Sequence, residues 1–115
     1  RIAADIEVGL AIPDADYQAG LRHLAVLRHA FWARLGPDDL VLIPAAPDVA
    51  PEAGTTGDPA FVIPTTVLGG PVATLRAGLC PDTGMPIGAL LFGAPGRDAL
   101  LAGMLLSQRA APLDL

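Results

Sequence analysis

The sequence predicts an α/β chain in which a mixed sheet, made of one strand plus a β-hairpin, is covered by amphipathic helices. Three observations support this fold class. Apolar residues recur with a helical period between Asp14 and Leu35, a short run of branched apolar residues follows at 40–43, and two apolar runs at 72–75 and 87–92 flank a turn. A chain of 115 residues is the size of one domain, so we treat 1–115 as a single segment.

The clearest predicted helix starts at Asp14, which we expect to cap it. The following Gly36-Pro37 predicts its end, because Gly accepts a left-handed backbone and Pro cannot continue the helical hydrogen bonds. Such a helix would be about 33 Å long. Its apolar positions recur every three or four residues and form one stripe: Tyr17, Leu21, Leu24, Leu27, Phe31 and Leu35.

The run Leu40-Val41-Leu42-Ile43 is continuous and apolar, which predicts a strand buried on both faces and central in its sheet. Residues 44–58 are rich in Pro, Gly, Ala and Thr, a composition typical of a loop. Residues 59–68 leave strand and helix both open, since their branched residues favour a strand while their prolines suit a first helical turn.

Three further elements complete the prediction. Residues 2–10 are expected to be the tail of a helix that starts upstream, because the chain opens on Arg1 without Met or a signal sequence. Cys80 to Gly84 supplies Pro, Asp and Gly for the turn of the hairpin. A second amphipathic helix is expected from Asp98 to Ser107 or Arg109.

Composition argues against several classes of partner. The net charge is −5, no Lys is present and the seven Arg are scattered, which disfavours nucleic acid. No run of about 18 apolar residues is uninterrupted, so we expect no membrane span and a soluble chain. Cys80 has no partner cysteine, which suggests a reducing cytoplasm, and with His23 and His29 it has no spacing typical of a metal site, so neither metal nor cofactor is expected.

Three stretches resemble, in order and spacing, the C-terminal part of amidase-signature hydrolases. The match covers nearly the whole chain, and its third stretch is the most specific. The stretches are Gly9-Leu10 with Asp16-Tyr17; Asp39-Leu40-Val41-Leu42-Ile43-Pro44 with Ala45-Ala46-Pro47 and Ala50-Pro51; and Leu68-Gly69-Gly70-Pro71-Val72-Ala73-Thr74-Leu75, Gly84-Met85-Pro86-Ile87-Gly88-Ala89-Leu90-Leu91-Phe92-Gly93 and Asp98-Ala99-Leu100-Leu101. The sequence departs from the family at Arg76, where Pro is usual.

The resemblance implies an amide-bond hydrolase whose Ser nucleophile, bridging Ser and Lys lie in a segment that precedes this one. Here Ser107 is the single Ser and Lys is absent, so no catalytic residue is expected in this chain. Its expected partners are the remainder of the amidase chain or a second copy, with a small-molecule amide bound only by the intact enzyme. A stand-alone structural or interaction module and a small-molecule-binding domain remain alternatives.

The resemblance also implies that the loop ending at Gly69 lines the acyl-binding wall, which makes Thr65, Thr66 and Gly69 the candidate substrate-binding residues. Thr66 stands where many members carry Asn and offers one hydroxyl donor in place of two amide donors. The alternative is that this stretch serves turn formation and packing: Gly69 and Gly70 permit a positive φ or a close backbone approach. For Phe31 and Trp32, we expect core or interface packing rather than a binding platform.

Overall fold

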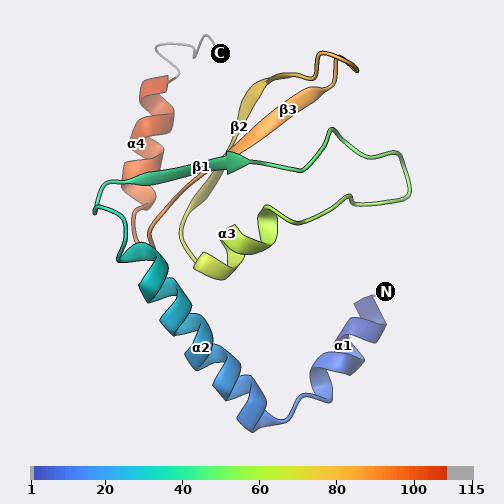
Figure 1. The fold of residues 1–115 in the computed structure, drawn as a ribbon, viewed down its shortest axis with the longest axis vertical. Helices are drawn as coiled ribbons and strands as arrows, with labels where there is room; N and C mark the ends of the chain where they lie inside the picture. Colours follow the sequence, from blue (N-terminus) through green and yellow to red (C-terminus); the bar gives the residue numbers. More distant parts are fainter. Residues whose placement is uncertain (1, 109–115) are drawn as a thin grey trace.

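The computed structural model of the protein describes residues 2–108, and these residues form four helices and three strands (Figure 1). The α/β class is therefore confirmed. In chain order the elements are α1 (Ile2–Leu10), α2 (Asp14–Trp32), β1 (Leu40–Pro44), α3 (Val62–Leu68), β2 (Val72–Leu79), β3 (Pro86–Gly93) and α4 (Asp98–Gln108).

The sheet has β3 at its centre, with β1 on one side and β2 on the other. Both pairings are antiparallel: Leu40 lies opposite Gly93 in one, and Val72 lies opposite Phe92 in the other. β1 and β2 thus run in the same direction, but β3 separates them. The expectation of a mixed sheet was therefore wrong for residues 2–108, because the tight hairpin makes β2 antiparallel to β3 and β1 then pairs on the opposite side of β3.

The position of β1 differs from the prediction as well. Its continuous apolar run indicated a central strand, yet β1 is an edge strand and the Leu42 side chain is 63% exposed. The run of apolar residues is compatible with burial on both faces, but no other element within residues 2–108 pairs with the outer side of β1.

The predicted hairpin is confirmed and is longer than its apolar core, because β2 continues through a bulge between Arg76 and Gly78. The turn between the strands is closed by two backbone hydrogen bonds. The N–H of Cys80 donates to the Met85 carbonyl and the N–H of Gly84 donates to the Cys80 carbonyl, both at 2.8 Å.

Helices lie on both faces of the sheet (Figure 1). Phe92 of β3 packs against Phe31 and Trp32 at the end of α2, with ring centroids 6.5 and 5.9 Å away. The next residue, Gly93, points to the opposite face, because side chains alternate along a strand, and there it lies beside Arg97 at the start of α4. The core is small: its buried side chains are Thr65, Leu90, Phe92 and Leu101. The expectation of a packing role for Phe31 and Trp32 is confirmed.

Both ends of α2 differ from the prediction. Pro13, not Asp14, occupies the N-cap position, and no side chain caps the helix there. The Pro13 carbonyl accepts the N–H groups of Asp16 and Tyr17, while Asp14 is already helical. The helix ends at Trp32, four residues before Gly36, because the backbone bonds that follow span three residues instead of four: the Arg34 N–H donates to the Phe31 carbonyl and the Leu35 N–H to the Trp32 carbonyl.

The remaining predicted elements agree with the structure in type. Residues 2–10 are helical, the long segment after β1 contains no helix or strand before residue 62, and α4 begins at the predicted Asp98. The ambiguous segment 59–68 is resolved as a helix, since the Pro59 carbonyl accepts the N–H groups of Val62 and Ile63 and so begins α3.

The molecule is open and flat, with extents of 50 × 40 × 19 Å. Its accessible surface of 8554 Å² exceeds by about 2,700 Å² the area of a compact chain of this mass. Neither α1 nor α2 contains a buried residue. Within residues 2–108 no helix combines the length and apolar character needed to cross a bilayer.

Candidate functional site

The candidate substrate-binding residues lie at the C-terminal end of α3, and their hydroxyl groups are engaged within that helix. Thr65 is 3% exposed and donates to the Val62 carbonyl at 2.8 Å. Thr66 is exposed and donates to the same carbonyl at 3.1 Å. Of the two hydroxyls, only that of Thr66 lies where a small molecule could reach it, and there it offers its acceptor lone pairs.

The backbone geometry of the following residues supports the structural role of the glycines. Gly69 has φ 75° and ψ 20°, the left-handed conformation of a helix C-cap, and its N–H donates to the Thr65 carbonyl at 3.2 Å. Gly70 lies against the backbone of Gly93, where a Cβ atom would collide with the Gly93 carbonyl oxygen. Gly69 therefore has the predicted positive φ, and Gly70 makes the predicted close backbone approach.

Two side chains from α2 cover the end of α3. The Arg28 guanidinium donates through Nε to the Val67 carbonyl at 2.6 Å, and the Trp32 indole donates to the Leu68 carbonyl at 3.1 Å. These bonds satisfy carbonyl groups that have no partner within a helix that ends there. The guanidinium also lies against Gly69, since a Cβ atom on that residue would come within 3.1 Å of the Arg28 Cζ.

The polar groups at the end of α3 are of two kinds. The half-buried Arg28 guanidinium lies beside Gly69, and its remaining N–H groups can donate to a carbonyl or carboxylate of a ligand, whereas the exposed Thr66 hydroxyl, whose proton is used within α3, can only accept. The single Ser of the sequence, Ser107, is on α4 and donates to the carbonyl of Met104 in its own helix at 2.7 Å. The roles of Thr65, Thr66 and Gly69 in substrate binding stay predictions.

Cys80 is the one cysteine of the sequence and lies at the start of the hairpin turn. Hydrogen bonding by the Thr83 side chain lowers the pKa of the Cys80 thiol, and backbone hydrogen bonds from Thr83 and Asp82 act in the same direction. The negative charge of Asp48 and partial burial oppose this effect. His23 and His29 lie exposed on α2, and within residues 2–108 no group of three or more His, Cys, Asp or Glu is placed to hold a metal ion.

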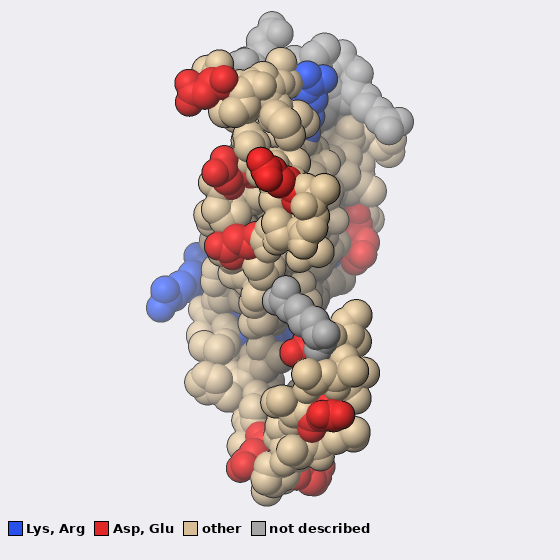
Figure 2. Space-filling model, turned by 90° about the vertical axis from the view of Figure 1, so that its right-hand side faces the viewer, with Lys and Arg blue, Asp and Glu red and all other residues tan. Residues whose placement is uncertain are grey.

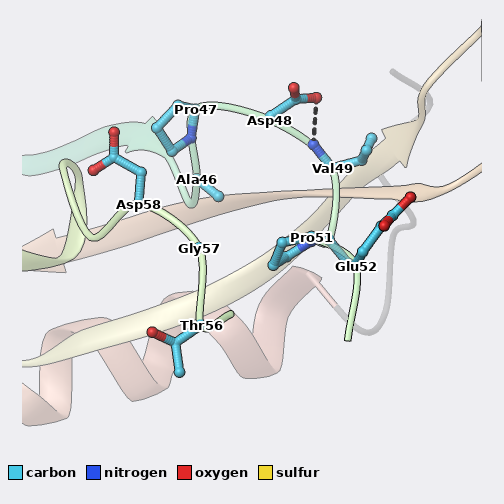
Figure 3. Close-up of a pocket in the computed structure, with 10 residues that line it drawn as sticks. Ala46, Pro47, Asp48, Val49, Pro51, Glu52, Thr56, Gly57 and Asp58 are labelled. Carbon is cyan, nitrogen blue, oxygen red and sulfur yellow. Dashed lines mark hydrogen bonds between the residues drawn. The ribbon is translucent and has the colours of Figure 1, made fainter. Parts of the chain in front are cut away.

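A hollow of 420 Å³ lies within the loop that follows β1, a segment that the sequence indicated only as a loop (Figure 3). It is lined by ten residues of this loop, among them two prolines, Pro47 and Pro51, and three acidic residues, Asp48, Glu52 and Asp58. Their carboxylates point in different directions rather than into the hollow, and that of Asp48 accepts the Val49 N–H at 2.7 Å. The hollow therefore has no convergent polar groups that would hold a ligand.

Acidic side chains are spread over the face of the molecule shown in Figure 2, with few basic groups among them. This distribution matches the net charge of −5 and gives that face no basic patch for phosphate binding.

Comparison with known proteins gives no relative: no family model, no curated protein and no solved structure matches the chain.

Proposed function

We propose that the chain is the C-terminal portion of an amide-bond hydrolase of the amidase-signature type, and that alone it is not catalytic. In this proposal it contributes β1, the hairpin and the covering helices to a larger fold. Its partner is the remainder of the amidase chain, and a small-molecule amide binds only when both parts are present.

The ordered match of three sequence stretches carries the proposal. The first stretch falls on the end of α1 and the start of α2, and the second on β1 and the loop that follows it. The third runs from the end of α3 through the hairpin to α4, which includes the glycine pair with its two distinct backbone roles. The stretches thus correspond to consecutive elements of one α/β unit.

The chemistry of the chain supports the second half of the proposal. A Ser hydroxyl attacks an amide only when a base removes its proton. The sequence contains no Lys to act as that base, and the hydroxyl of Ser107 is bonded to its own helix. Substrate contact would come from Thr66 and Gly69 at the end of α3, beside the Arg28 guanidinium.

The test has two arms. The purified chain, assayed against a panel of aliphatic and aromatic amides, should show no turnover above buffer, and Ser107→Ala should give the same result. The coding region directly upstream should specify a Gly-Ser-Ser-Gly-type segment and a Lys, and the longer protein should hydrolyse amides until that Ser or Lys is replaced.

Two results would contradict the proposal. One is turnover by the chain itself that persists through repurification and disappears in Ser107→Ala. The other is an upstream start codon with neither the Ser-rich segment nor the Lys, which would favour a stand-alone interaction module instead.

A further inference from the structure

The two edges of the sheet are built differently. At the β2 edge a bulge between Arg76 and Gly78 interrupts the regular strand, and Arg76 places a charge beside it. Bulges, charges, prolines and short strands are among the features with which proteins prevent edge-to-edge pairing. β1 is short and ends in Pro44, but it has no bulge and no charge: its register with β3 is continuous, and residues 40–43 are all apolar and uncharged.

The backbone groups that β1 turns outward follow from its pairing with β3. The N–H of Ala45 donates to the Gly88 carbonyl at 2.9 Å, so this residue points inward, toward β3. Because direction alternates along an antiparallel strand, Ile43 and Val41 also bond inward, while Leu42 and Leu40 turn their N–H and C=O groups to the open edge. Pro44 is an outward position too, which is where a strand tolerates a residue without an N–H.

From this geometry we propose that two copies of the chain pair antiparallel through their β1 edges, with Leu42 on the two-fold axis. Each Leu42 then donates its N–H to the carbonyl of Leu42 of the partner subunit. Each Leu40 donates to the carbonyl of Pro44 of the partner subunit, and each copy lacks one donor, the N–H of Pro44. The two sheets join into a continuous one, in the order β2-β3-β1-β1-β3-β2.

The side chains of β1 are complementary to themselves in this register. Leu42 meets Leu42 of the partner subunit on the face covered by α4, and Val41 meets Ile43 of the partner subunit on the face covered by α2 and α3. A pairing in which the same patch serves both subunits closes into a dimer instead of growing into a filament.

The exposed surface of the chain is compatible with a second copy as the partner of β1. A standard interface takes about 800 Å² from each partner. The chain as a whole exposes about 2,700 Å² more than a compact chain of its mass, and the β1 edge, with its 63% exposed Leu42, supplies one part of that surface. The paired strands carry no charge, so two chains of net charge −5 bring no like charges into direct contact at β1.

Sedimentation velocity or light scattering of the 115-residue chain at tens of micromolar should give the mass of a dimer. Leu42→Lys places two like charges opposite each other at the axis and removes the Leu42 contact, so the dimer dissociation constant should rise roughly tenfold or more. The matched control is Thr74→Lys, an outward position on the β2 edge, which should leave the mass unchanged. Because Leu42 is exposed, far-ultraviolet circular dichroism of both variants should match the parent.

Mixing Leu42→Lys with Leu42→Glu tests the register itself. Position 42 faces position 42 across the axis, so the mixture should recover the dimer mass that each variant lacks. A monomeric parent chain, an unchanged dimer in Leu42→Lys, or a mixture that stays monomeric would overturn the proposal. The measured mass tests the dimer proposal, and amide turnover tests the hydrolase proposal. Failure of one proposal is therefore distinguishable from failure of the other.

Discussion

The same substitution, Gly to Ala, should change stability in opposite directions at two positions of this fold. At Gly70 the new methyl group meets the carbonyl of Gly93, and relief requires the α3–β2 connection to move away from β3. That movement strains the hydrogen bond from the Gly93 N–H to the Pro71 carbonyl, which measures 3.1 Å. At Gly103, within α4, nothing lies within 4 Å of the new methyl group.

The magnitudes follow from these surroundings. Inserting a methyl group into a packed backbone contact costs about 1–3 kcal/mol, and loss of the neighbouring hydrogen bond adds about 1 kcal/mol, so Gly70→Ala should destabilise the fold by about 2–4 kcal/mol. Ala in an exposed helix interior is favoured over Gly by about 0.5–1 kcal/mol, which is the gain expected for Gly103→Ala. For a chain of this length, 1 kcal/mol corresponds to about 4 °C in Tm.

Thermal unfolding followed by circular dichroism at equal protein concentration measures both effects. We expect Tm to fall by about 8–16 °C in Gly70→Ala and to rise by about 2–4 °C in Gly103→Ala. If Gly70→Ala melts within about 2 °C of the parent, or if both variants lose stability equally, the close approach of Gly70 to Gly93 does not exist as described.

Three further predictions concern other parts of the molecule. Trp32→Phe keeps an aromatic ring against Phe92 but leaves the Leu68 carbonyl without its donor, so a chemical denaturation curve should show a loss of about 1 kcal/mol; an unchanged midpoint would contradict the capping of α3 by α2. Alkylation of Cys80 by iodoacetamide should reach half its maximal rate below the pH of an ordinary thiol, because hydrogen bonding to Thr83 lowers the thiol pKa. Thr83→Ala should raise that pH, and an identical profile would refute the assignment. Added salt should tighten the proposed dimer by screening the net charge of −5 on each copy, whereas a dimer that dissociates in salt would require ion pairs at the interface.

Local patterns predicted most elements of the fold. The helical period marked α2 and α4, and the turn chemistry of Cys80 to Gly84 marked the hairpin. These features depend on residues close in sequence, which is why they could be derived without the fold.

Features that depend on residues far apart in the sequence could not be predicted from the sequence alone. A continuous apolar run is found both in central strands and in some edge strands. The run 40–43 therefore did not reveal that β1 lies at an edge. Likewise, nothing local indicates that Arg28 and Trp32 would bond carbonyls 39 and 36 residues away. The candidate site was expected at Gly69, but the guanidinium that accompanies it follows only from packing.

The placement of Trp32 gives the fold a built-in optical reporter. It is the single tryptophan of the sequence, it lies edge-on to Phe92 of the sheet, and its indole N–H is bonded at the end of α3. Its emission should therefore respond to the meeting point of α2, α3 and β3, while the helical dichroism signal sums over all helices. Comparing the two signals during unfolding would separate loss of the junction from fraying of α1, which contains no buried residue.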